Sequence, residues 1–175
     1  MAEEGYAAVT SRSVAARAGI PAGLVHYYFP TVDDLFVAIV NRGADINLRR
    51  MARALASPEP LVALWRLSSD PRGGALLEEI IAASHHRKAL REQVTALAET
   101  TRGMQIEAMQ ELLPQYGIDE EHFPPALVAA AIQGIALLVA REESLGVSSG
   151  HEIATAVEAI LEDLERRRAG DSEQS

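Results

Sequence analysis

The stretch from Val9 to Leu35, VTSRSVAARAGIPAGLVHYYFPTVDDL, decides the fold. The Thr10 side chain can accept a hydrogen bond from the first turn of a helix, and Gly19 can adopt the left-handed conformation that ends it. Pro21 suits the first turn of a following helix because its ring fixes φ near the helical value. The stretch therefore predicts two short helices joined by a tight turn.

The apolar side chains of this stretch divide each expected helix into two faces. On the first helix, Val14, Ala15 and Ala18 share one face, where the small Ala15 lets a second helix cross closely. Val25 and Phe29 point back from the second helix. The other side chains of the second helix are not needed for a core, which favours a helix-turn-helix that reads the major groove of DNA.

On these residues the sequence resembles the TetR (tetracycline-repressor) family of bacterial transcription regulators. The resemblance runs from Gly5 to about Arg42 and rests on Gly5-Tyr6, Thr10, Val14-Ala15, Ala18-Gly19-Ile20, Gly23, His26-Tyr27-Tyr28-Phe29 and Asp34-Leu35. It implies an all-α protein with an N-terminal helix-turn-helix and a helical ligand-binding and dimerisation domain. It also implies DNA contacts from Ser11, Arg12, Ala22, Gly23, Leu24, His26, Tyr27 and Tyr28.

Two departures from the family pattern bear on DNA affinity. Family members carry a full helix before Gly5-Tyr6, whereas only Met1 to Glu4 stand there in this sequence, so the helix-turn-helix is expected to be incomplete at its N-terminus. Either the native chain begins upstream or it binds DNA poorly. The family often places Lys after Phe29, but the residues that follow here are Pro30 to Asp33, without positive charge. Each lost phosphate contact weakens binding, so we expect modest affinity from each half-site, raised by dimerisation.

Composition places the expected DNA-binding surface in the N-terminal third. The chain has 175 residues, 48% of them hydrophobic, and a net charge of −9. Residues 1–57 carry six Arg and five acidic residues, whereas residues 58–175 carry ten basic and twenty acidic residues. A polyanion is therefore favoured by the first part and repelled by the second. The absence of Cys excludes disulfides and Cys-zinc sites, and fits a reducing cytoplasm.

Helical periodicity continues along the chain and strand patterns are nearly absent, so we expect about eight helices. The clearest patterns cover Asp33–Ala56, Ala75–His86, Leu90–Leu112, Pro125–Leu145 and His151–Arg168, the last ending in three Arg. We expect a DNA-binding domain over 1–42, an effector-binding and dimerisation domain over 43–170, and a polar tail over 171–175. The longest apolar run, Ala126–Ala140, is shorter than the ~20 residues of a membrane span, so no membrane partner is expected.

The layout implied by the resemblance places a small-molecule effector and a homodimer partner on the second domain. The candidate effector-binding residues are Met51, Leu55, Trp65, Ile81, His85, Met104, Met109 and Gln133. Methionine adapts to varied apolar ligands, and Gln133 is the polar residue of an apolar run. The candidate dimer-interface residues are Leu127, Ala131, Ile135, Leu138, Ile153, Val157, Ile160 and Leu164.

Two further motifs resemble an enzymatic site and a metal site, but they lack the features that such sites need. Gly146-Val-Ser-Ser-Gly150 fits the pattern of a nucleophile elbow, but that elbow needs a strand before it, and this motif joins two expected helices. His85, His86 and His122 lack the spacing of a metal site. We therefore expect no enzyme activity, no cofactor and no metal. The leading hypothesis is a ligand-responsive, DNA-binding repressor; the alternative is a helical ligand-binding dimer that has lost DNA binding.

Overall fold

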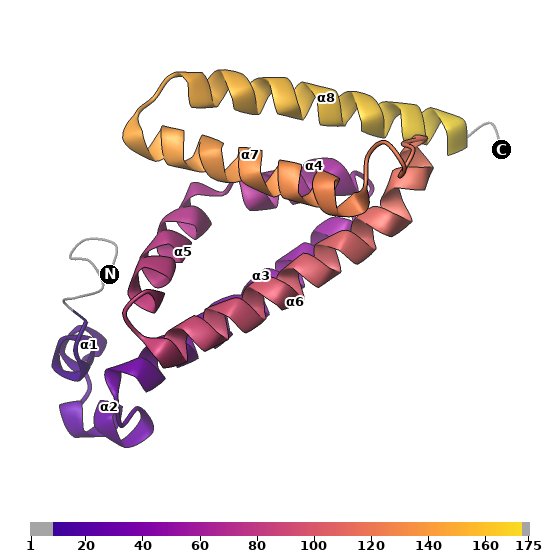
Figure 1. Ribbon diagram of the computed structural model, residues 1–175. Helices are drawn as coiled ribbons and strands as arrows, with labels where there is room; N and C mark the ends of the chain where they lie inside the picture. The colour runs from indigo at the N-terminus through magenta and orange to yellow at the C-terminus, as the bar shows by residue number, and fades with distance from the viewer. Residues whose placement is uncertain (1–8, 173–175) are drawn as a thin grey trace. The chain divides into compact units, whose positions relative to one another are not determined.

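The computed structural model describes the backbone of residues 9–172 and the side chains of residues 9–70 and 78–170 (Figure 1). The described part is all-α, as predicted, and contains no strand. Its helices are α1 (Ser11–Ala18), α2 (Ala22–Tyr28), α3 (Val32–Leu55), α4 (Pro60–Ser68), α5 (Pro71–Ser84), α6 (Lys88–Leu112), the 3-10 helix η2 (Leu113–Tyr116), α7 (Pro125–Leu145) and α8 (Ser149–Ser172).

Most helix boundaries agree with the periodicity of the sequence. Helix α7 has the predicted bounds, and α3 and α6 differ from prediction by one or two residues at their ends. Three ends were wrong. Helix α5 begins at Pro71, four residues before the predicted Ala75. Helix α8 continues to Ser172, so the three Arg near its end do not mark its terminus, and α5 ends at Ser84, which leaves His85 and His86 in the turn that follows. The residues Met1 to Ala8, which include the Gly5-Tyr6 motif, lie outside the described part.

The described chain divides into two compact units that are not continuous in sequence. The first unit comprises residues up to Asn47 together with Ala75–Ala98, and the second comprises Leu48–Gly74 together with residues from Glu99 onward. Helices α3, α5 and α6 each contribute residues to both units. The core of the first unit is built from three helices: Phe36, Val40, Ile80, Ala83 and Leu90 are buried in it.

The second unit has the larger core, to which α3, α4, α6, α7 and α8 contribute. Its buried members include Met51, Leu61, Val62, Trp65, Met109, Leu113, Ala136, Val139 and Leu161. Gly150 lets α8 start close to the end of α7, because a Cβ at this position would lie 3.0 Å from the Cβ of Glu142. Gly146 ends α7 with a φ of 74°, and Ser149 begins α8. The Gly146–Gly150 motif is thus a connection between two helices, as predicted.

A buried carboxylate ties three elements of the second unit together. Glu165 on α8 is only 3% exposed, and its Oε1 accepts a hydrogen bond from the Leu61 backbone N–H in the first turn of α4 at 2.8 Å. Negative charge at a helix N-terminus is stabilising. The Tyr116 hydroxyl of η2 donates to Oε2 at 2.8 Å, and Arg168 Nη2 lies 3.2 Å from the same oxygen. Burial, with this hydrogen bond to Glu165, raises the pKa of the Tyr116 phenol, which keeps the donor protonated.

Replacing Tyr116 by Phe removes one donor from this carboxylate and should lower the free energy of unfolding by about 1–2 kcal/mol. The measurement is urea unfolding followed by circular dichroism at a fixed protein concentration. Tyr27→Phe is the matched control, because the Tyr27 side chain is 77% exposed and should not change stability. Equal unfolding midpoints for Tyr116→Phe and the unsubstituted protein would show that the hydrogen bond does not stabilise the fold.

Candidate nucleic-acid interface

Helix α1 begins with a reciprocal cap and ends at a left-handed glycine. The Ser13 backbone N–H donates to Thr10 Oγ1 at 3.1 Å, and the Thr10 backbone N–H donates to Ser13 Oγ at 2.9 Å. Gly19 has a φ of 67°, and the next backbone N–H, that of Ile20, donates to the Ala15 carbonyl at 3.1 Å. The roles predicted for Thr10 and Gly19 are confirmed. Pro21 stands one residue earlier than expected, as the N-cap of α2.

Helices α1 and α2 pack against each other through small side chains. Ala15 of α1 and Val25 of α2 are each only 3% exposed. Val25 is the sole buried residue of α2. The prediction for the inner face is right for these two residues and wrong for Ala18, which is exposed, because α2 has only seven residues and cannot cover all of α1. Helix α2 thus buries one side chain and leaves most of its surface open.

The residues predicted to contact DNA lie on this open surface. Leu24, Tyr27 and Tyr28 are 43%, 77% and 66% exposed, and the two tyrosine rings meet edge to face with centroids 5.2 Å apart. Arg12, Ala22, Gly23 and His26 are also exposed, whereas Ser11 is half-buried. All eight belong to α1 or α2, so the structure brings them together in one motif.

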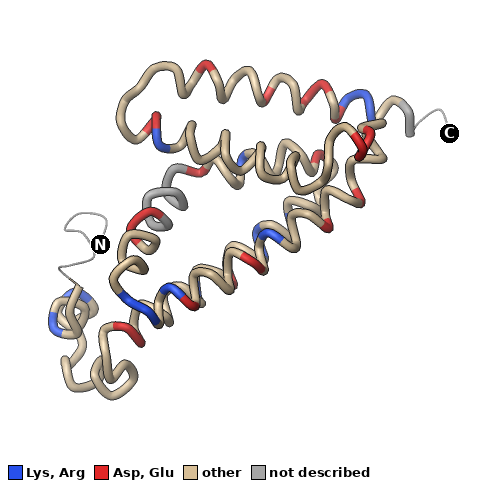
Figure 2. The backbone as a smooth tube through the Cα atoms, viewed as in Figure 1, with Lys and Arg blue, Asp and Glu red and all other residues tan. Residues whose placement is uncertain are grey.

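The charges around the motif are unevenly placed. Figure 2 shows basic residues on α1 and neither sign of charge on α2. The acidic pair Asp33 and Asp34 follows in the first turn of α3. Asp34 is a cap: its Oδ2 accepts hydrogen bonds from the Thr31 hydroxyl at 2.7 Å and the Thr31 backbone N–H at 2.9 Å. These bonds lower the pKa of Asp34 below its ordinary value.

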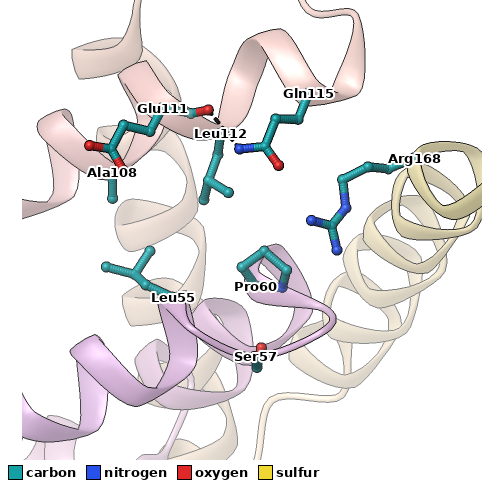
Figure 3. A pocket seen from close by; sticks show the side chains of 8 residues that line it. All are labelled: Leu55, Ser57, Pro60, Ala108, Glu111, Leu112, Gln115 and Arg168. Carbon is teal, nitrogen blue, oxygen red and sulfur yellow. Dashed lines mark hydrogen bonds between the residues drawn. The ribbon is translucent and has the colours of Figure 1, made fainter. Parts of the chain in front are cut away.

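The second unit contains a cavity of about 230 Å³ (Figure 3). It is lined by Leu55, Ser57, Pro60, Ala108, Glu111, Leu112, Gln115 and Arg168. Four of these side chains are apolar and four are polar. Gln115 Nε2 donates to the Glu111 carbonyl at 2.9 Å, and the buried Ser57 hydroxyl has no hydrogen-bond partner within the described part of the chain. The wall of the cavity thus offers both apolar side chains and polar or charged groups.

The predicted effector-binding residues are distributed over both units, and of the eight only Leu55 lines this cavity. Met51, Trp65 and Met109 are each 2% exposed and belong to the core of the second unit, against which the half-buried Met104 packs. Gln133 accepts a hydrogen bond from Gln105 Nε2 at 3.1 Å. Ile81 and His85 belong to the first unit and are exposed.

The predicted dimer-interface residues fall into two groups. Ile153, Val157 and Leu164 of α8 are half-buried and pack against the core of their own unit. The second group is exposed on α7 and α8 and consists of Leu127, Ala131, Ile135, Leu138 and Ile160. Leu127, Leu138 and Ile160 are 56%, 46% and 62% exposed, which leaves large apolar side chains uncovered on both helices.

Comparisons with known proteins agree with this geometry. Residues 1–39 match the family model of bacterial regulatory proteins of the tetR family. A crystal structure from Rhodococcus sp., described as a TetR-family transcriptional regulator, superposes with a TM-score of 0.72 at 15% identity, over 94% of this chain and 91% of that one. Salmonella enterica GusR superposes with a TM-score of 0.69 at 16% identity, over 94% and 88%. No curated protein matches.

The class that the fold and the exposed motif define is the helix-turn-helix transcriptional regulators, which bind DNA. The match over residues 1–39, together with the shared fold, confirms the resemblance found in the sequence. Residues 1–39 thus resemble the N-terminal domain of the tetR family of bacterial regulatory proteins, and the fold of the chain resembles that of the two solved structures.

Sequence reasoning missed the polar residues of the cavity and the contacts that fix them. Arg168 is the last of the three Arg that end the helical pattern in the sequence, yet it lines the cavity and is paired with the buried Glu165. The sequence pattern gave no indication of Ser57, Glu111 or Gln115. Ser57 precedes α4, Glu111 belongs to α6 and Gln115 to η2, and they line one cavity with Arg168 of α8, a meeting that no local spacing signals. One sequence signal pointed to the pairing of Arg168: Glu165 and Arg168 are an acidic and a basic residue at an i,i+3 spacing.

Gly19→Ala should destabilise the helix-turn-helix by about 1 kcal/mol, because a side chain at positive φ is strained. Gly23→Ala is the matched control: it lies within α2, a Cβ there meets nothing within 4 Å, and alanine favours a helix. Hydrogen exchange of the α1 and α2 amides should therefore become faster in Gly19→Ala and slower or unchanged in Gly23→Ala. The same rates in both variants would contradict the role given to Gly19.

Proposed function

We propose that the protein is a homodimeric repressor that binds a double-stranded DNA operator through α2 and releases it when a small molecule binds the second unit. The observation that carries this proposal is the surface of α2, which buries Val25 and leaves Leu24, His26, Tyr27 and Tyr28 exposed. Aromatic and apolar side chains that gather on one exposed face mark an interaction surface.

The exposed groups suit the chemistry of a DNA groove. Tyrosine hydroxyls and a histidine N–H donate hydrogen bonds to phosphate oxygens, which position a protein without reading sequence. Arg12 adds a positive charge at the start of α1. Leu24 can contact a thymine methyl group, and the small Ala22 and Gly23 allow the backbone to approach the bases. Because α2 itself carries no charge, affinity depends on several weak contacts.

The exposed apolar face of α7 and α8 supports a second copy of the chain as partner. Leu127, Ala131, Ile135 and Leu138 recur every three or four residues along α7, and Ile160 is exposed on α8. Helix α7 is long and apolar enough to cross a membrane by length and composition, but only 22% of its most apolar window is buried within the chain. Contact between two such faces would remove this apolar surface from water and generate a two-fold dimer. Two α2 helices could then occupy successive major grooves about 34 Å apart.

The cavity of the second unit supports a small-molecule effector. It holds about 230 Å³, and Leu55, at the end of α3, is part of its wall. Helix α3 is continuous from Val32, directly after the helix-turn-helix, to Leu55, so movement at one end can be transmitted to the other. An effector that binds better to a conformer unsuited to the operator lowers DNA affinity, and DNA lowers effector affinity by the same factor.

The alternative, a ligand-binding dimer without DNA binding, draws support from the uncharged α2 and the acidic start of α3. The decisive measurement is fluorescence anisotropy of a labelled duplex taken from the region flanking the gene, at two salt concentrations. We expect saturable binding that weakens with salt, and a three- to tenfold loss of affinity in Tyr27→Phe, equivalent to about 1 kcal/mol for one hydrogen bond. Absence of binding to any duplex from this region would favour the alternative.

Charge placed on the exposed face of α7 or α8 should prevent dimerisation. Leu138→Glu and Ile160→Glu bury a carboxylate if that face is an interface, which costs several kcal/mol. Light scattering should give the mass of a monomer for both variants, while Gln110→Glu, at an exposed polar position of α6, should leave a dimer. Dimers in all three variants would place the interface elsewhere.

A further inference from the structure

A pair of side chains far apart in sequence joins the start of α3 to the turn between α5 and α6. Arg87 Nη1 donates to Asp33 Oδ1 and forms an ion pair with it. The Arg87 guanidinium also lies 5.1 Å from the centroid of the Phe36 ring. Both partners of Arg87 lie in the first turns of α3, so one side chain contacts this helix through a charge and through a ring.

The surroundings of this pair distinguish it from an ordinary surface ion pair. The Arg87 and Asp33 side chains are 28% and 39% exposed, so both are partly withdrawn from water. Phe36 is fully buried at the centre of the first core, where Ile80 and Leu90 also lie. A guanidinium over a desolvated ring gains more than an exposed one. The arginine is therefore held in one place from two sides.

The turn that carries Arg87 is itself anchored. Arg91 of α6 donates from Nη2 to the His85 carbonyl at 2.7 Å and from Nε to the Ser84 carbonyl at 3.3 Å. The carbonyl that ends α5 and the next carbonyl, in the turn, are thus bonded to the first turn of α6. On the other side, three residues separate the end of α2 from the start of α3, and the Thr31–Asp34 cap fixes this short link.

We propose that Arg87 is a positioning residue for DNA binding: through Asp33 and Phe36 it fixes the start of α3, and with it the helix-turn-helix that precedes α3. The inference rests on the proposed DNA-binding function. Arg87 acts through α3 and does not itself contact the DNA.

A double-mutant cycle of Arg87→Met and Asp33→Asn tests the proposal with the same labelled duplex. Each single variant should weaken DNA binding by roughly 3- to 30-fold. The double variant should bind no more weakly than Arg87→Met alone, because either substitution already removes the Arg87–Asp33 ion pair. The salt dependence should keep its slope. If instead the two effects multiply, or if Arg87→Met lowers the slope by about one phosphate contact, Arg87 touches DNA directly and the proposal is wrong.

Arg66→Met is the matched control, since Arg66 pairs with Glu158 at 2.6 Å within the second unit and should leave DNA affinity unchanged. Should Arg87→Met fail to fold, the milder Asp33→Asn still has to weaken binding for the proposal to stand. An affinity equal to that of the unsubstituted protein would reject it.

A second readout needs no DNA and separates this inference from the proposed function. The chain has no cysteine, so spin labels can be placed at Ala16→Cys on α1 and Thr95→Cys on α6, both exposed positions of the first unit. With labelled protein diluted into unlabelled protein, electron–electron distance measurements should give a narrow distribution that Arg87→Met broadens. An unchanged distribution overturns the positioning role, whereas failure of the unsubstituted protein to bind DNA overturns only the proposed function.

Discussion

One packing constraint underlies the rest of the structure: helix α2 buries a single side chain. A helix of seven residues that buries a single valine against Ala15 is held by its neighbours in the chain: Gly19 before it and the Thr31–Asp34 cap after it. Because α2 packs through so small a face, its position depends on the turn at Gly19, which has positive φ, and on the short link to α3. The constraint also frees the outer face of α2, so the side chains there are available to a DNA groove.

In the proposed function, the first unit binds DNA and the second unit binds the effector and the partner subunit. The first unit surrounds Phe36 with α3, α5 and α6, and Val9, which shortly precedes α1, packs against this core. The second unit encloses a cavity and leaves an apolar face on α7 and α8. The buried Glu165 bonds to α4 and η2, so the cavity wall is built on fixed elements. Because α3 and α6 belong to both units, a change in either core has a route along the backbone.

The helices could be predicted because they depend on residues close together in sequence. Contacts between residues far apart in sequence could not. Thr10, Gly19 and the heptad-like spacing along α7 act over a few residues, so helix positions could be predicted from the sequence. The exposure of Tyr27 followed from the short length of α2. By contrast, Arg87 meets Asp33 across 54 residues, and Leu61 meets Glu165 across 104, separations that carry no local signal. The effector-binding candidates were chosen by residue type, and type alone does not distinguish the core position of Trp65 from the cavity position of Leu55.

The most direct test of the central claim is cleavage of DNA from the surface of α2 itself. In this cysteine-free chain, Leu24→Cys can carry an iron–EDTA group, and the cut positions on a bound duplex can then be mapped. The account predicts two clusters of cuts about one helical turn apart, and none when the group is attached through Phe123→Cys, at an exposed position in the second unit. Cuts of equal strength from both attachment points, or none from Leu24→Cys on DNA that the protein binds, would contradict it.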